Sequence, residues 1–192
     1  MKKLLLVLCI LPAHLLRAQQ ESHSLWGLKA GPNFYTLSPG GDGVSGRKAI
    51  HAGWWYRHPI TPVFSTQTEL LFSMEGWKFS NNAVTVSNKF NFLQLPILLQ
   101  FKTQKGLYFE TGPQLGLRIS GKQEAGSNDG AVDFFPIDTW TNRWIFSGAV
   151  GAGYLPDRLG LGVRYNFGIT SLVKNTDGRS NGLSVSLLYA FR

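Results

Sequence analysis

The stretch RLGLGVRYNFGITSL, residues 158–172, alternates strictly between two kinds of side chain. One set of alternate positions is apolar, whereas the positions between them carry three glycines and two larger polar residues, Arg164 and Asn166. A strict period of two predicts a β-strand with two chemically different faces. Glycine on a solvent-facing strand surface weakens the strand and packs against nothing. The pattern therefore raises the question of where each face points.

Seven further segments repeat this two-faced pattern, and each is roughly as long as a strand that crosses a bilayer at a tilt. They are residues 25–35, 48–57, 63–75, 91–102, 107–119, 144–154 and 182–192. No segment shows a helical period, and the 22 glycines disfavour helices. The sequence predicts an all-β fold, an eight-stranded antiparallel up-and-down transmembrane β-barrel.

The connections between these segments alternate in length. Four are long and polar, at residues 36–46, 76–89, 121–142 and 170–181, and three are short turns, at residues 58–62, 103–106 and 155–158. Outer-membrane barrels place long loops outside the cell and short turns in the periplasm. This sorting predicts a location in the outer membrane.

In such a barrel the apolar face meets lipid, and the face with glycine, arginine and asparagine lines the lumen. A soluble barrel of the lipocalin type, which binds a small apolar ligand in its interior, is the alternative. It would reverse the two faces, so that the large apolar side chains line the inside. The two models therefore differ in the direction of every strand residue.

The first 18 residues read as a secretory signal peptide, with Lys2 and Lys3 before an apolar core and a cleavage site before Gln19. The predicted mature domain is then residues 19–192. Cys9, the one cysteine, lies in the signal peptide, so the mature chain has no thiol for a disulfide or a metal site. The net charge of +8 comes from scattered residues and forms no run that would follow a phosphate backbone, which argues against nucleic acid as a partner.

Four stretches carry a resemblance to a known family: GLKAGPNF, FLQLPILLQFK, LYFETGPQLGLRIS and GAGYLPDRLGLGVRYNFGIT. They resemble the PorT-like outer-membrane β-barrel proteins common in Bacteroidetes. The acidic residue that usually precedes the Ile-Pro pair of that family is replaced by Gln94, before Leu95-Pro96. The resemblance implies an eight-stranded outer-membrane barrel and implies little about activity. The C-terminal strand also resembles the signal read by the barrel-assembly machinery, although Arg192 follows the aromatic Phe191.

Charged residues on the predicted inner face form the first candidate site. Buried charges must be paired, and Glu69 and Glu110 are the anions that can pair with the inner cations. We expect a polar network that fills and stiffens the lumen, formed by Lys29, His51, Arg57, Glu69, Glu110, Arg118 and Arg164. A small pore through the lumen is the alternative, but an eight-stranded interior leaves little room for a solute.

A catalytic site is the alternative at His51, the one mature histidine that points into the predicted lumen, with Glu69 or Ser65 as its nearest candidate partners. A structural histidine is the better interpretation, so we expect no catalytic residue, no metal site and no cofactor. Partner contact is instead expected in the longest loop, through Phe134, Phe135 and Trp140. The predicted function is that of a non-enzymatic outer-membrane protein with a structural or interaction role, with membrane lipid, the barrel-assembly machinery and an extracellular or envelope protein as partners.

Overall fold

A computed structural model describes residues 23–81, 84–127, 132–135, 137 and 139–191. Its strands are β1 (Leu25–Ser38), β2 (Val44–Pro59), β3 (Phe64–Ser80), β4 (Val84–Lys102), β5 (Leu107–Ser127), β6 (Val132–Phe135), β7 (Trp144–Tyr154), β8 (Leu159–Gly168) and β9 (Arg179–Phe191). Among the described residues, no helix is long and apolar enough to span a bilayer. The signal peptide predicted at residues 1–18 lies outside the described residues.

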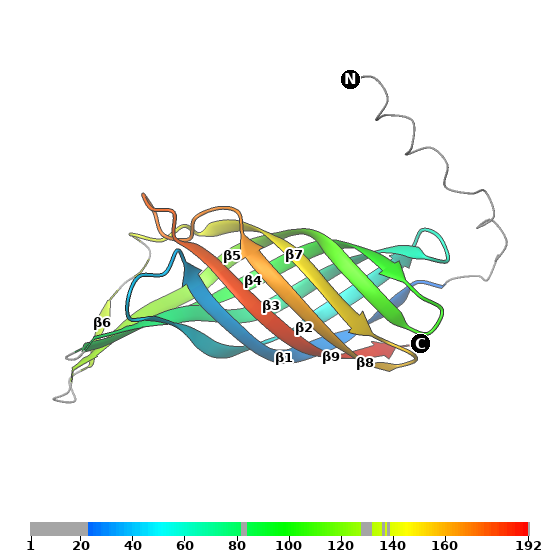
Figure 1. The fold of residues 1–192 in the computed structure, drawn as a ribbon, viewed down its shortest axis with the longest axis horizontal. Coiled ribbons are helices and arrows are strands. Elements are labelled where there is room, and N and C mark those ends of the chain that lie inside the picture. The colour runs from blue at the N-terminus through cyan, green and yellow to red at the C-terminus, as the bar shows by residue number, and fades with distance from the viewer. Residues whose placement is uncertain (1–22, 82–83, 128–131, 136, 138, 192) are drawn as a thin grey trace, which may run out of the picture.

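Eight of the strands form one closed antiparallel ring, in the order β1–β2–β3–β4–β5–β7–β8–β9 (Figure 1). The ring closes between the first and last strands, where Trp26 lies opposite Phe191 and Leu28 opposite Tyr189. In hydrocarbon every backbone N–H and C=O must be bonded within the protein, and only a closed sheet does this for strands. The predicted eight-stranded up-and-down barrel is confirmed.

The two faces of the strands point as the period-two pattern predicts. In β8, the outward Leu161 is 61% exposed, whereas Arg164 on the opposite face is only 4% exposed. The other strands of the ring likewise turn large aliphatic and aromatic side chains outward, so that they form a continuous apolar band around the barrel. This arrangement is the reverse of a lipocalin, which places its apolar side chains inside.

Glycines on the inner face make room for bulky side chains from neighbouring strands. A Cβ at Gly153 would lie 2.3 Å from the Tyr108 ring, and one at Gly162 would lie 2.8 Å from the Tyr108 hydroxyl oxygen. A Cβ at Gly160 would lie 2.8 Å from the Leu155 side chain. The inner glycines of residues 158–172 therefore allow an eight-stranded interior to close around Tyr108 and Leu155.

Two of the predicted long loops are mostly strand, which corrects the sequence-based boundaries. The connection predicted at 36–46 is reduced to residues 39–43, and the one predicted at 76–89 is reduced to 81–83. The sequence predicts loops here because the polar content of these segments hides the alternation once the chain leaves the apolar band. A separate register shift lies opposite Asn91 and Phe92, where β5 carries an extra residue between Arg118 and Ser120.

The ring is much taller on one side than on the other. Strands β3, β4 and β5 have 17, 19 and 21 residues, whereas β7 and β8 have 11 and 10. The difference corresponds to roughly 20–35 Å along the strands at about 3.3 Å per residue. The parts of β3, β4 and β5 nearest to β6, together with the short β6 that pairs with β5, form a sheet that we call the extension. It projects to the left in Figure 1.

The three short connections lie at the end of the barrel opposite the extension, at residues 60–63, 103–106 and 155–158. We call this the short-turn end. The chain enters β1 and leaves β9 at this same end, as the even number of ring strands requires.

A charged substitution in the middle of the apolar band tests the orientation of the faces. We expect Val163→Arg to destabilise the folded barrel by about 2–4 kcal/mol, because the guanidinium would lie near the bilayer midplane. Ile169→Arg, just beyond the end of the same strand, should cost only about 0–1 kcal/mol. Urea unfolding in lipid vesicles measures both, and equal costs would contradict the membrane orientation.

Candidate functional site

Arg164 is the centre of the buried charge cluster in the lumen. Its guanidinium bridges two carboxylates: Nη1 and Nη2 donate to the Glu69 oxygens at 2.7 and 2.8 Å, and Nε donates to Glu110 Oε1 at 2.7 Å. The three side chains come from β8, β3 and β5, on different sides of the ring. Planar guanidinium groups suit such paired contacts, which hold the opposite walls at a fixed separation.

Other polar groups complete the coordination of the two carboxylates. Lys29 Nζ lies 3.2 Å from Glu69 Oε1, and Gln67 Nε2 donates to the same oxygen at 2.6 Å. Gln100 Nε2 donates to Glu110 Oε2 at 2.9 Å. Lys29, Arg164, Glu69 and Glu110 together carry two positive and two negative charges, so this buried group is neutral.

Toward the short-turn end, the cluster gives way to an aromatic layer around Arg57. Arg57 Nε donates to Gln67 Oε1 at 3.1 Å, and its guanidinium carbon lies 5.3 Å from the Trp55 ring centroid and 5.1 Å from that of Tyr108. Trp55 and Tyr108 belong to an apolar cluster with Leu155 and Leu188. Cation–π contact compensates part of the cost of burying Arg57 here.

His51 has a different partner from the ones considered in the sequence. Its Nε2 lies 2.9 Å from Ser186 Oγ on β9, and in the described part of the chain the ring forms no hydrogen bond with Glu69 or Ser65. Within the described chain, no carboxylate hydrogen-bonds to Nδ1. A serine–histidine pair without an orienting carboxylate lacks the third member of a hydrolytic triad.

A second polar group, around Glu75, was missed from the sequence. The buried Glu75 carboxylate accepts hydrogen bonds from Ser180 Oγ at 2.8 Å and from Gln94 Nε2, and Ser73 Oγ lies 3.5 Å away. Glu75 follows the inner-face alternation of β3, and this could have identified it. Gln94 on β4 is a donor to this carboxylate.

Arg118 is buried on β5 at the level of Phe92, which lies opposite it in β4, and its backbone N–H donates to Arg143 O at 2.8 Å. It therefore lies closer to the extension than the central cluster does. Glu69 and Glu110, the anions expected for Lys29, Arg118 and Arg164, both form ion pairs with Arg164.

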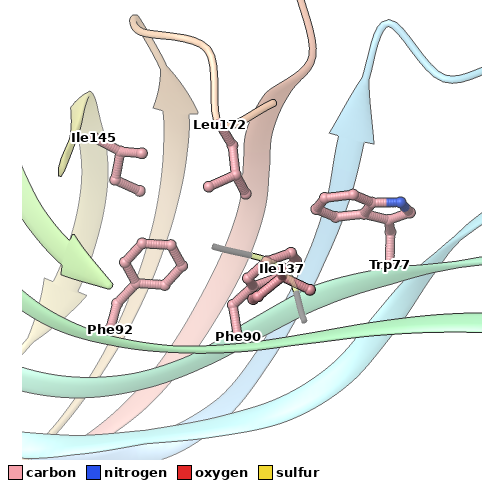
Figure 2. Packing of buried hydrophobic residues seen from close by; sticks show 6 residues of the cluster. All are labelled: Trp77, Phe90, Phe92, Ile137, Ile145 and Leu172. Atoms are coloured by element: carbon pink, nitrogen blue, oxygen red, sulfur yellow. The ribbon is translucent and has the colours of Figure 1, made fainter. Parts of the chain in front are cut away.

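Apolar side chains close the lumen at the extended end (Figure 2). The cluster combines inner-face residues of β3, β4 and β7 with residues of the connections, and its members are Trp77, Phe90, Phe92, Ile137, Ile145 and Leu172. Trp77 and Phe90 are stacked, with ring centroids 5.0 Å apart. We call this cluster the upper cap.

Of the three predicted loop contacts, Trp140 packs against the upper cap. Its ring lies edge-on to Trp77 and Phe90, with centroids 6.5 and 6.4 Å away, and it is half-buried. Packing of this ring against the cap makes it a poor candidate for partner contact. Phe134 and Phe135 form part of β6, and their side chains lie outside what the structure describes.

Together these layers close the lumen between the two ends. Between the upper cap and the aromatic layer, a cavity about the size of one water molecule is lined by buried polar side chains, among them Asn33, His51 and Asn166. In the described parts of the chain, no group of three or more His, Cys, Asp or Glu residues is arranged to hold a metal ion. The arrangement fills the described lumen with buried side chains and can stiffen the barrel.

Neutralising Glu69 should be costly, because Lys29 and Arg164 would lose a buried counter-charge. Breaking a buried ion pair by removing one partner typically costs about 3–5 kcal/mol, and we expect Glu69→Gln to lower the free energy of unfolding by that amount. Asp157→Asn, on an exposed short turn, should change it by less than about 0.5 kcal/mol. Urea titration in detergent micelles compares them, and a neutral result for Glu69→Gln would show that the pairing is dispensable.

Solved structures with the same fold come from bacterial outer membranes. The attachment invasion locus protein Ail of Yersinia pestis matches with a TM-score of 0.50 at 15% identity, over 88% of this chain and all of Ail. The neisserial surface protein A, NspA, matches with a TM-score of 0.53 at 15% identity, over 88% of this chain and all of NspA. At this identity the likeness concerns the fold alone. No curated protein sequence matches the chain significantly.

A family model described as an outer membrane protein beta-barrel domain matches residues 17–174. These residues are more than half of the chain and include the ring strands from β1 to β8. The match agrees with the closed ring, the outward apolar band and the outer-membrane barrels of the same fold. The chain belongs to the outer membrane protein beta-barrel domain family and is an outer-membrane protein.

Proposed function

We propose that this protein is a non-enzymatic integral outer-membrane barrel that binds an extracellular or envelope protein through its extension. The observation that carries the proposal is the combination of a filled lumen with a sheet that projects well beyond the apolar band. Because side chains fill the lumen, the extension is the remaining candidate for binding a partner. Membrane insertion does not require it. Long extracellular segments with short periplasmic turns are the usual layout of such barrels.

The lumen supports this role better than that of a pore. The upper cap, the neutral charge cluster and the aromatic layer follow one another along the barrel axis, and each is buried. Opening a path would separate Arg164 from Glu69 and Glu110 in a poorly solvated interior, which is costly. The barrel walls and their filling are therefore expected to act as a rigid base for the extension.

The lumen also supports a non-enzymatic role. The His51–Ser186 pair is buried and has no orienting carboxylate hydrogen-bonded to it within the described chain. A nucleophile needs an activated proton acceptor and access for a substrate. His51 is better explained as a hydrogen-bonded structural residue.

Membership in the PorT-like group is part of this proposal and is supported by the four sequence stretches quoted above. Insertion by the barrel-assembly machinery is supported by the C-terminal strand, whose outward Tyr189 and Phe191 lie with ring centroids 5.2 Å apart. The name of Ail as an attachment invasion locus protein supports surface interaction as a role that this kind of barrel can perform.

Shortening the extension tests the proposed interaction. Residues 79–86 are replaced by Asn-Gly, which forms a two-residue hairpin turn between the paired Lys78 and Ser87. We expect protein crosslinks formed on intact cells to be lost, while the heat-modifiable electrophoretic mobility of the barrel is kept. The matched control replaces residues 103–106, a periplasmic turn, by Asn-Gly. Crosslinks that survive shortening of the extension, or disappear equally in the control, would refute the role of the extension.

The filled lumen predicts a barrel that does not conduct. In planar bilayers the purified protein should give no discrete conductance steps under voltage. Gly substitution of three cap residues, Trp77, Phe90 and Phe92, should still give none, because the charge cluster and aromatic layer lie below the cap. Regular conductance steps from the unaltered protein would favour a pore.

A further inference from the structure

The outer face of the extension carries lysines at its base, on four adjacent strands. Lys89 on β4 lies opposite Lys122 on β5 and opposite Gly76 on β3, and Lys78 lies two residues beyond Gly76. Lys48 continues the set on β2. We call Lys48, Lys78, Lys89 and Lys122 the basal lysine row.

The register places this row on the outside of the barrel. Trp77 and Phe90 point into the upper cap, so their neighbours Lys78 and Lys89 lie on the opposite face of the sheet. The side chains of Lys122 and Lys89 are 57% and 32% exposed. Lys48 is also exposed, and it lies opposite the outward Phe34.

The row lies just above the apolar band. On β2, β4 and β5 the nearest exposed apolar residues are Ile50, Leu93 and Ile119, two to four residues toward the membrane. Allowing for strand tilt, this separation is roughly 5–10 Å. The headgroup layer on each side of a bilayer is about 5–8 Å thick. Lysine stems can turn their ammonium groups back toward that layer.

Positive charge dominates this face. Glu124 is the acidic residue that the structure describes within the row, and Lys89 and Lys122 hydrogen-bond to it. These hydrogen bonds, first from Lys122 and then from Lys89, lower the pKa of Glu124 to about 2, so it stays ionised at neutral pH. Four lysines and one glutamate give this face a charge of +3.

We propose that the basal lysine row binds the phosphate groups of anionic lipids in the outer leaflet. A row of cations at headgroup height, next to a lipid-facing surface, is complementary to a layer of phosphates. A soluble acidic polymer is the weaker fit, because the row lies at the membrane boundary rather than at the tip of the extension. This inference does not depend on the protein partner proposed above.

Native mass spectrometry of the detergent-purified protein tests the proposal, with phosphatidic acid and phosphatidylcholine as the probes. The unaltered protein should retain phosphatidic acid in preference to phosphatidylcholine. Each basic residue near an anionic surface contributes about 1 kcal/mol, or about fivefold in affinity. Lys78→Gln combined with Lys122→Gln should therefore weaken phosphatidic acid binding by roughly 25-fold.

Two further variants make the test specific. Glu124→Gln removes the anion in the row and should strengthen phosphatidic acid binding by about fivefold. Lys105→Gln makes the same charge change as one lysine substitution, on an exposed periplasmic turn, and should alter binding by less than about twofold. Heat-modifiable mobility verifies that every variant is folded.

Three results would overturn the proposal. The first is equal retention of the two lipids by the unaltered protein. The second is a loss of phosphatidic acid binding in Lys105→Gln as large as in the double variant. The third is binding of a sulfated polysaccharide that requires the row while phosphatidic acid binding does not, which would assign the row to a soluble polymer.

Discussion

The requirement that every backbone hydrogen bond be made within the chain governs this structure. In hydrocarbon each unpaired peptide group costs several kcal/mol, so the sheet must close on itself, and β1 meets β9. A ring of eight strands encloses a space that side chains can fill. The composition of the inner face follows from this narrow space, including the glycines that accommodate Tyr108. The outer face needs only to be apolar over the height of the bilayer.

The interior combines two solutions to the problem of filling a narrow barrel. Apolar side chains close both ends, and ionised groups occupy the middle in a neutral arrangement around Arg164. Buried ion pairs contribute little net stability when compared with apolar packing, but they are strongly selective for the geometry that satisfies them. In this barrel the cluster joins β1, β3, β5 and β8, and this cross-bracing favours one stagger of the strands.

The period-two pattern predicted the strand count, the closed antiparallel ring and the direction of each face, because lipid and lumen impose opposite demands on neighbouring residues. The pattern could not predict which side chains pair with each other inside the lumen. His51 meets Ser186, which is 135 residues away in the sequence and belongs to another wall of the barrel. Inner-face Trp55, Phe90 and Leu188 depart from the polar pattern, and their packing in the aromatic layer and the upper cap depends on strand stagger. Outside the bilayer the apolar alternation is lost, so the sequence predicted loops in segments 36–46 and 76–89 that are mostly strand.

The seam between β1 and β9 has a consequence for biogenesis. The two strands that must pair are the first and the last of the barrel, and their outward rings at the seam, Trp26 and Phe191, lie with centroids 4.5 Å apart. Until the final strand arrives, β1 has an open edge, and the contact that seals the cylinder spans nearly the whole polypeptide. Such a non-local contact is slow to form, and a chain that lacks its last dozen residues would leave the edge of β1 unpaired and the barrel open.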